Sequence, residues 1–395
     1  MTTAATRLFW TKIHRWLGLA ALAFLLIAGL TGSILCFDKR IDAAINPDLF
    51  YRQTKGAAGS PALIATAIQA RHPELVVTSF PLHLQASETL KLDVAPRRPD
   101  GSLGFDQLFV DPSDGHVVGT RQSGPGWDRR HVVEAIFELH QNLLGGAVGR
   151  WVMGLAALAW LIGNCVGLYL TLPAKKPFWP KWKKKWTIDT GAKLRRLMLE
   201  IHNSSGLWLL IPATVLAYTS VSMNFFDEAF VPLMQAVSPA RPSMFDQPPP
   251  ANDTRRPTIG FLDALNIGSA AAKVRGLTWQ PAIERFDPAH NVYSISFTDD
   301  GTENYRRLGP VALYFDASNG RLVEADDPYH DSLGRKLTRS LYPLHSGEMG
   351  GPIGIALIFL LGLSTAEMCI TGFYTWWKKR ESRRRGGGTA GRRPA

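Results

Sequence analysis

Two stretches of the sequence decide its architecture: residues 139–149 read LHQNLLGGAVG, and residues 344–354 read LHSGEMGGPIG. Both contain a Leu-His pair, a Gly-Gly pair and a further glycine at the same spacing, and each precedes an apolar run long enough to cross a bilayer. A second motif, His-x3-Gly, opens two other apolar runs, as HRWLG at 14–18 and HNSSG at 202–206. The sequence therefore holds four histidines in two matched pairs. Ionisable residues at the edges of membrane spans are candidates for function.

The two halves of the chain repeat at an offset of 205 residues. Identical residues recur at this offset without a gap over about sixty positions. Among them are Gly104 and Gly309, Asp111 and Asp316, His140 and His345, Gly167 and Gly372, and Tyr169 and Tyr374. A repeat of this length predicts that each half is a helix, an external domain and a second helix, and that the halves are parallel repeats.

The fold that we expect is a membrane α-helical bundle of four transmembrane helices, built from a duplicated half, with two external α+β domains. Each external segment has a helical stretch followed by strand-like stretches, which predicts one helix on a small antiparallel sheet. The sequences at 111–115 and 316–320 predict hairpin turns, in which glycine supplies positive φ. Residues 238–258 are a Pro-rich linker.

The predicted boundaries follow from these apolar runs. The first run lacks a small-x-small cleavage site and carries His14, so we interpret it as a retained span and not as a signal peptide. The predicted segments are an N-terminus at 1–13, transmembrane helices at 14–37, 148–172, 202–225 and 352–377, external domains at 38–147 and 226–351, a basic loop at 173–201 and a basic disordered tail at 378–395.

The charges predict the orientation in the membrane. The N-terminal stretch up to and including Arg15 has three basic residues and no acid, the loop after the second span has nine and two, and the tail has eight and one. Positive segments stay in the cytoplasm, so both termini and the short loop are inside and both external domains outside. The net charge of +11 therefore reports topology and gives no support for nucleic-acid binding. The KKPFWPKWKKKW stretch is either an interfacial anchor on anionic lipid or a docking site for an electron donor.

The four histidines suit the axial positions of two haems. Haem iron in a b-type electron-transfer centre needs two strong axial donors, and two neutral imidazoles meet that need. His14 and His202 lie at the cytoplasmic side of their spans, whereas His140 and His345 lie at the periplasmic side. A span of about 24 residues is roughly 36 Å long, so one haem cannot join His14 to His140. The sequence predicts an inner haem between His14 and His202 and an outer haem between His140 and His345.

Two glycines support the inner haem. Gly18 and Gly206 follow their histidines at i+4, on the same helix face, where a side chain would collide with the porphyrin. The glycines after His140 and His345 lie off the histidine face, and close helix packing explains them as well as haem does. Glu367, within the fourth span, either sets the haem potential or passes a proton, or it pairs with Ser, Thr or Asn across the bundle.

The HRWLGL opening, the two LH-x4-GG motifs, the external domains and the basic ends together resemble the PepSY-associated transmembrane family. These are bacterial inner-membrane proteins that include reductases of ferric siderophores, and the resemblance covers nearly the whole chain. It implies an inner-membrane location, two PepSY-like periplasmic domains, and an oxidoreductase that reduces Fe(III)-siderophore and releases Fe(II). No nucleotide-binding motif follows a strand, so the electron donor would be a separate protein, a reduced flavin or a quinol.

The acceptor is expected to dock between the external domains, close to the outer haem, on Arg130, Arg335 and Tyr342. The two arginines are related by the offset of 205, and they either attract anionic oxygens of the siderophore or neutralise haem propionates. His131 and His330 are alternative ligands or acceptor contacts.

Two other functions remain open at this point. One is a haem-free regulator or scaffold whose PepSY-like domains bind a periplasmic peptide or protease. The other is a permease subunit, against which the small number of polar residues inside the spans argues.

Overall fold

The computed structural model describes residues 4–389 except 55, 99, 240–242, 247 and 250–256. It divides into two compact units. The helical unit comprises Met1–Phe37, Ile136–Pro232 and Leu344–Ala395, and the sheet unit comprises Asp38–Ala135 and Leu233–Pro343. Much of the linker predicted at 238–258 lies outside the described residues, and within it a 3-10 turn spans Met244–Asp246.

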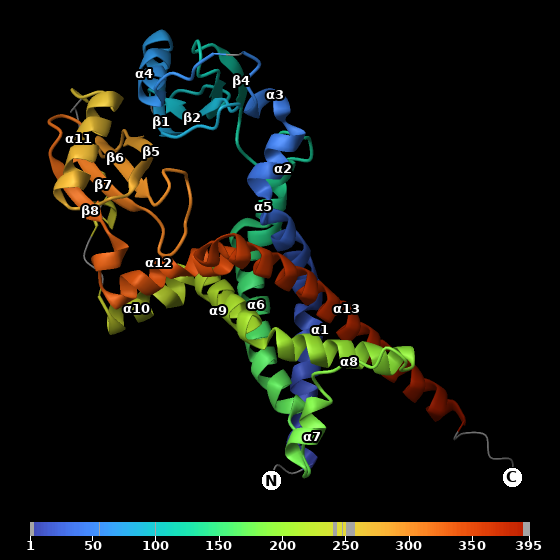
Figure 1. Ribbon diagram of the computed structural model, residues 1–395. Coiled ribbons are helices and arrows are strands. Elements are labelled where there is room, and N and C mark those ends of the chain that lie inside the picture. The colour runs from blue at the N-terminus through green and yellow to red at the C-terminus, as the bar shows by residue number, and fades with distance from the viewer. Residues whose placement is uncertain are drawn as a thin grey trace, which may run out of the picture. The chain divides into compact units, whose positions relative to one another are not determined.

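The helical unit is built mainly from long apolar helices (Figure 1). Its main helices are α1 (Ala4–Leu35), α6 (Gly146–Thr171), α8 (Leu194–Trp208), α9 (Leu210–Asn224) and α13 (Gly351–Thr389). Within the described ranges, three helices are long and apolar enough to cross a membrane, and α8 and α9 pass the same test only as a bent pair. Large apolar side chains face outward from these helices, such as Ile211, which is 77% exposed, and Ile353, which is 84% exposed. Such side chains are suited to contact with lipid.

Helices α1 and α13 cross closely at two small residues. A Cβ atom added at Gly29 would lie 2.6 Å from the carbonyl oxygen of Gly362, so neither position tolerates a larger side chain. Next to this crossing, the Ser33 hydroxyl lies 2.9 Å from the Gly29 oxygen and 3.0 Å from the Phe359 oxygen. Small residues and an interhelical hydrogen bond are the usual means by which helices associate in lipid.

The third span, predicted at 202–225, is a bent pair of helices and not one straight helix. Helix α8 ends at Trp208, α9 begins at Leu210, and their axes differ by 73°. The cause is Pro212, which lacks an amide hydrogen and whose ring clashes with the carbonyl four residues earlier, at Trp208. Pro212 is tolerated because it falls in the first turn of α9, where its missing donor has no partner to lose.

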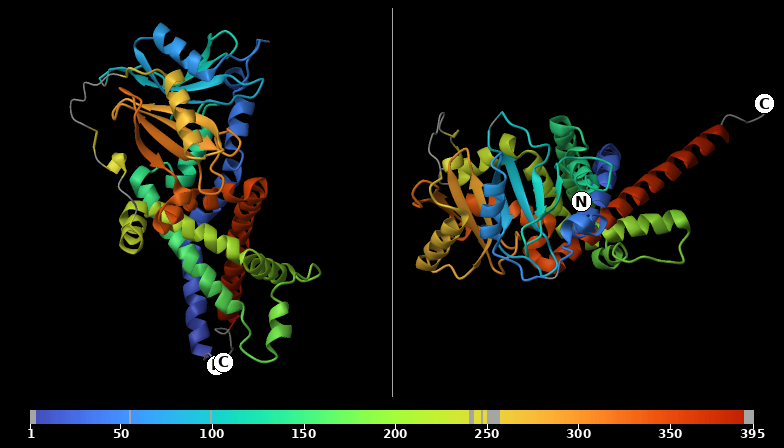
Figure 2. Two further views of the ribbon diagram at one scale, coloured as in Figure 1. Left: turned by 60° about the vertical axis from the view of Figure 1, so that its left-hand side comes forward. Right: turned by 90° about the horizontal axis from the view of Figure 1, so that it is seen from above.

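The disordered tail predicted from residue 378 is also wrong for the residues that the structure describes. Helix α13 continues to Thr389 as one long helix (Figure 2). An ion pair of 2.9 Å joins Lys378 to Glu381, and the Arg380 guanidinium lies 5.5 Å from the Trp376 ring centroid. Residues 390–395 lie outside the described part. Helix α1 likewise begins ten residues before His14, so His14 lies within a helix and not at its start.

The sheet unit contains one antiparallel sheet of eight strands, in the order β4-β3-β2-β1-β5-β6-β7-β8. The strands are β1 (Leu75–Pro81), β2 (Leu90–Pro96), β3 (Gln107–Val110), β4 (Val117–Arg121), β5 (Gln280–Asp287), β6 (Val292–Thr298), β7 (Val311–Asp316) and β8 (Leu322–Asp326). The prediction of two separate small sheets is therefore wrong. Pairing of β1 with β5, with Phe80 opposite Glu284, joins the two halves into one sheet.

Helices α4 (Pro61–Arg71) and α11 (Phe261–Val274) pack against each other and against the central strands of this sheet. The core between them includes Phe80, whose ring centroid lies 5.1 Å from that of Phe261, and Tyr293, 5.5 Å from Phe261. In each half, the helix that packs on the sheet is followed by four strands.

The two predicted hairpin turns are confirmed. Gly115 has φ of 73° and Gly320 has φ of 70°, and each donates its amide to the carbonyl of the aspartate four residues earlier, at 2.9 and 2.8 Å. The left-handed conformation explains why glycine recurs at this position.

Candidate functional site: two histidine pairs

The structure brings the four motif histidines together in the two pairs that the topology predicts. The ring centroids of His14 and His202 lie 6.4 Å apart, and those of His140 and His345 lie 6.1 Å apart. His14 comes from α1 and His202 from α8. His140 comes from α5 (Val132–Asn142), which ends shortly before α6, and His345 comes from α12 (Leu333–Ser346), which ends shortly before α13. All four rings are only partly exposed.

These separations suit one metal ion between two imidazoles. A metal–imidazole bond is about 2.0 Å long, and the ring centroid lies about 1 Å behind the nitrogen, so two rings on opposite sides of one ion have centroids about 6 Å apart. Direct ring packing without an ion also occurs at such separations. The distance therefore permits a shared metal without requiring one. The hydrogen bonds of the rings show which ring nitrogen is free to bind it.

In the second pair, both rings are held by threonines. The Thr31 hydroxyl lies 2.7 Å from the carbonyl oxygen of Ile27, to which it donates, and 3.0 Å from Nδ1 of His140. Because a hydroxyl has one hydrogen, Thr31 then accepts from His140, whose Nδ1 carries the proton. Thr219 does the same for His345, at 3.1 Å, while it donates to the Leu216 oxygen. This arrangement leaves Nε2 of each ring unprotonated and able to bind a metal.

The first pair shows the same arrangement on one side. Nδ1 of His202 lies 3.2 Å from the Met368 carbonyl oxygen and 3.2 Å from the Thr371 hydroxyl. A carbonyl only accepts, so Nδ1 of His202 is the donor and Nε2 is free. On the His14 side, Nδ1 has no hydrogen-bond partner among the described residues.

Three glycines allow helices to approach the histidine rings from behind. A Cβ atom at Gly167 would lie 3.2 Å from Cε1 of His14, and one at Gly372 would lie 3.3 Å from Cε1 of His202. A Cβ atom at Gly32 would lie 2.9 Å from Cε1 of His140. Each glycine is on a neighbouring helix, so the packing of the bundle fixes the plane of these rings.

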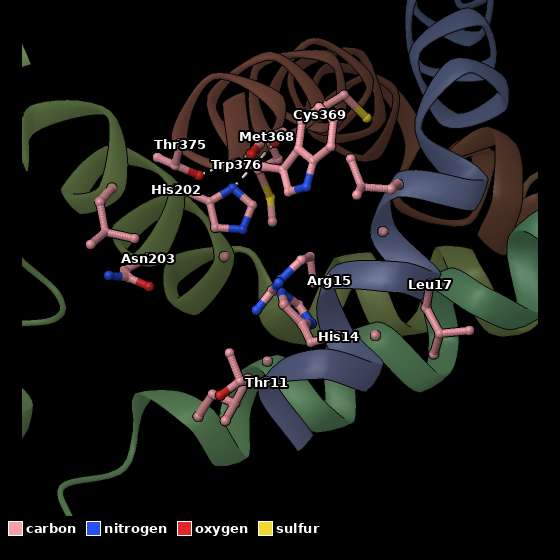
Figure 3. Close-up of a pocket in the computed structure, with 18 of the residues that line it drawn as sticks. Thr11, His14, Arg15, Leu17, His202, Asn203, Met368, Cys369, Thr375 and Trp376 are labelled. Carbon is pink, nitrogen blue, oxygen red and sulfur yellow. Dashed lines mark hydrogen bonds between the residues drawn. The ribbon is translucent and has the colours of Figure 1, made fainter. Parts of the chain in front are cut away.

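His14 and His202 border a cavity of about 800 Å³ in the helical unit (Figure 3). Helix α1 contributes Thr11, His14 and Arg15, α8 contributes His202, and α13 contributes Met368, Cys369 and Trp376. Gly18 and Gly206 line the cavity as well, and a Cβ atom added at Gly18 would meet no atom within 4 Å. A glycine at this position keeps the space beside His14 open. The volume falls within the range of small-molecule and cofactor sites.

Of the described residues that line this cavity, Arg and Lys are the charged ones, and none is Asp or Glu. Arg7 has a structural role. Its guanidinium donates hydrogen bonds to the carbonyl oxygens of Leu170 and Leu172, at 2.5 and 2.9 Å, near the end of α6. The others are Arg15, Lys185, Arg195, Lys379, Arg380 and Arg384. The cavity thus combines apolar walls, two metal-binding side chains and a cationic lining, which suits a flat apolar metal complex with anionic substituents.

Glu367 precedes Met368, which lines this cavity. Its carboxylate is 3.3 Å from the Thr371 hydroxyl, which also lies against His202, and it interacts with the Ser205 side chain on α8. These contacts match the expected pairing with Ser and Thr across the bundle. They also place the acid behind His202, so the two interpretations of Glu367 are compatible.

The residues expected to receive the acceptor belong to the sheet unit and have partners there. Arg130 pairs with Asp48, and Arg335 pairs with Asp326 at 3.0 Å. The Tyr342 ring centroid lies 5.2 Å from that of Tyr305. A role in docking stays a prediction, and it would require these arginines to bind an anion in addition to their carboxylates.

His131 and His330 are not placed as ligands. Nδ1 of His131 lies 2.7 Å from Asp128, and Nδ1 of His330 lies 2.8 Å from Asp327. The hydrogen bond that His131 donates to the Asp128 carboxylate raises the pKa of His131 above its usual range. A histidine that favours its charged form is a poor metal ligand.

The threonines at the second pair were not identified from the sequence, although a signal was present. His14, Gly18 and Thr31 recur as His202, Gly206 and Thr219 at an offset of 188. Each segment thus carries a histidine of the first pair and, 17 residues later, the acceptor for a histidine of the second pair. In the sequence, the glycines behind His14 and His202, Gly167 and Gly372, are marked only as members of the repeat.

The family model described as PepSY-associated TM region matches residues 11–379. None of the curated proteins with which the chain was compared is similar to it at a significant level.

Proposed function

The chain belongs to the PepSY-associated transmembrane family, and from this premise we propose that it is a bacterial inner-membrane cytochrome with two b-type haems. The observation that carries the proposal is the hydrogen bonding of the histidines. At His140, His202 and His345, acceptors behind the rings hold the proton on Nδ1 and leave Nε2 for a metal. Bound there, haem would carry one electron at a time from one side of the membrane to the other.

The proposed orientation has both termini in the cytoplasm and the sheet unit, with its PepSY-like halves, in the periplasm, because the basic segments are retained inside. His14 and His202 then lie toward the cytoplasm. Helix α1 spans the distance between the sites, since Thr31 is 17 residues beyond His14, or about 25 Å at 1.5 Å per residue. The parallel repeat of helix, external domain and helix explains why each site takes one histidine from each half.

The chain's own side chains would have distinct roles. His14, His202, His140 and His345 would bind the iron, and the threonines would fix the orientation of the rings. Arg15, half-buried within α1 and lining the cavity, would pair with a propionate. An ionisable side chain inside a span generally has such a partner.

The proposed reaction at the periplasmic side is the one-electron reduction of Fe(III)-siderophore to Fe(II), which releases the iron because the chelate binds Fe(II) far more weakly. Arg130, Arg335 and Tyr342 are the proposed contacts for the anionic chelate. Since both arginines have carboxylate partners, they would attract the chelate only weakly.

The experiment is the reoxidation of the reduced, purified protein by ferric siderophores. We expect the reduced absorption bands to disappear on mixing, with one Fe(II) formed per electron lost. Reoxidation by oxygen alone, with no acceleration by any ferric chelate, would contradict the substrate assignment. A colourless purified protein would instead favour a haem-free regulatory protein that binds a peptide or protease through its sheet unit.

A further inference from the structure

The cations around the His14–His202 cavity exceed what two haem propionates need. Six cationic residues other than Arg7 line it, with no acid among the lining residues. They converge from α1, from the loop after α7 (Phe178–Lys183), from α8 and from α13. Two carboxylates would be neutralised by two of them. The remaining positive charge faces a space that opens beside the predicted iron ligands.

Retention of basic segments in the cytoplasm explains cations on this side of the membrane, but it does not explain their arrangement at the cavity. In the same segments, two ion pairs between described residues involve neighbours that do not line it. Arg196 pairs with Glu200 at 2.8 Å, and Lys378 pairs with Glu381 at 2.9 Å. Arg15 and Arg195, which line the cavity, form no ion pair with a described residue. Glu200 and Glu381 therefore pair with cations outside the lining, and Arg15 and Arg195 keep their positive charge at the cavity.

On the basis of the proposed function, we infer that this cavity binds a small anionic electron donor, a reduced flavin mononucleotide, through its phosphate. The phosphate is the group that the arginines and lysines recognise. A flavin also meets the chemical requirement, since it can pass electrons singly, whereas a nicotinamide transfers hydride. A neutral quinol would gain nothing from the cations.

The electron balance is complete with the acceptor already named. One dihydroflavin loses two electrons and two protons and becomes oxidised flavin. The two electrons leave one at a time and reduce two Fe(III)-siderophores to Fe(II). The two protons pass to water on the cytoplasmic side. No further reductant or oxidant is needed.

The test compares oxidised flavin mononucleotide with riboflavin, which has the same ring system without the phosphate. Full-length protein in phosphatidylcholine nanodiscs is titrated with each, and binding is followed by flavin fluorescence, so the result does not depend on electron transfer. We expect the phosphate to strengthen binding about tenfold, the gain typical of one charge-assisted hydrogen bond. The preference should diminish as salt is raised. Equal binding of the two flavins, or none, would overturn the inference.

Variants locate the effect. Arg195→Gln and Lys185→Gln should each remove most of the preference for the phosphate, because both residues line the cavity. Lys184→Gln is the matched control, since Lys184 is adjacent and exposed but does not line the cavity. If the control removes the preference as strongly as the other two, the effect is that of net charge and the inference fails.

A lipid phosphate could occupy the same cations, and nanodiscs containing phosphatidylglycerol separate the two sources. A preference that persists in these discs supports the flavin. Its loss at constant ionic strength would mean that the cations serve a lipid headgroup, which overturns the inference. The haem content of the same sample keeps the two proposals apart. Two haems without a phosphate preference contradict only the flavin site, whereas absence of haem contradicts the proposed function.

Discussion

The two units of the molecule differ in the hydrogen bonding of their buried polar side chains. In the helical unit, three of the four histidines have Nδ1 hydrogen-bonded to a threonine or a carbonyl, and the opposite nitrogen is left available. In the sheet unit, Glu284 on β5 is fully buried, and neither carboxylate oxygen has a hydrogen-bond partner among the described residues. Burial raises the pKa of Glu284 to about 9.

This difference in hydrogen bonding distinguishes side chains that are oriented to bind a ligand from a buried side chain that only lowers stability. A side chain whose one polar atom is bonded and whose other atom is free is oriented for a ligand. A buried acid with no partner on either oxygen has no such orientation, and an unsatisfied buried polar group lowers stability. Burial of a polar residue therefore identifies a candidate site only when its hydrogen bonds fix its direction.

The largest effect that the comparison predicts is the loss of one haem per chain. His202→Ala should remove the haem of the first pair and leave the other, and His345→Ala should do the reverse, because each change removes an axial ligand. Haem per chain, measured by the pyridine haemochrome assay, should fall from two to one in both variants. Two haems remaining in either variant would show that the pairing by structure is not the pairing of ligands.

The next effect concerns the pH dependence of stability in the sheet unit. Folded Glu284 keeps a proton that the unfolded chain releases near pH 4.5, so the free energy of unfolding should fall as the pH rises from about 5 to about 9. Each unit of pKa shift corresponds to about 1.4 kcal/mol, which makes the total several kcal/mol. Glu284→Gln should abolish this slope.

Hydrogen-exchange protection of β1 and β5 in the full-length protein, corrected for intrinsic exchange, measures the slope. Asp100→Asn, at an exposed position, should leave it unchanged. A slope that survives in Glu284→Gln would mean that another group carries the proton.

The smallest effect concerns the threonines. Thr219→Val removes the acceptor of His345 while it nearly keeps the side-chain volume, and loss of such an outer partner typically weakens metal binding about 10–100-fold. We expect easier loss of the haem held by His140 and His345 and no change at the other site. Thr219→Ser, which keeps the hydroxyl, should restore retention. Equal loss from both sites would indicate general destabilisation of the bundle.

Much of the architecture could be predicted from local patterns. The repeat, the apolar runs and the paired motifs were sufficient to pair His14 with His202 and His140 with His345. The hairpin glycines were predictable because positive φ restricts the residue type. The bend at Pro212 could also have been predicted, since proline within an apparent helix is a known cause of breaks.

Other features depend on contacts that a sequence pattern does not contain. The pairing of β1 with β5 is a long-range contact between halves, and alternation within each strand does not say which edges meet. The isolation of Glu284 follows from that pairing. The hydrogen bonds of Thr31 and Thr219 required two helices to be placed side by side. The offset of 188 marked these threonines but could not say what they contact.

The central claim, that each histidine pair holds one haem, is tested most directly by the number of haems in the purified full-length protein. The pyridine haemochrome assay, together with the spectrum of the reduced protein, should give two b-type haems per chain with bis-imidazole ligation. A colourless protein, or one haem per fully folded chain, would contradict the claim.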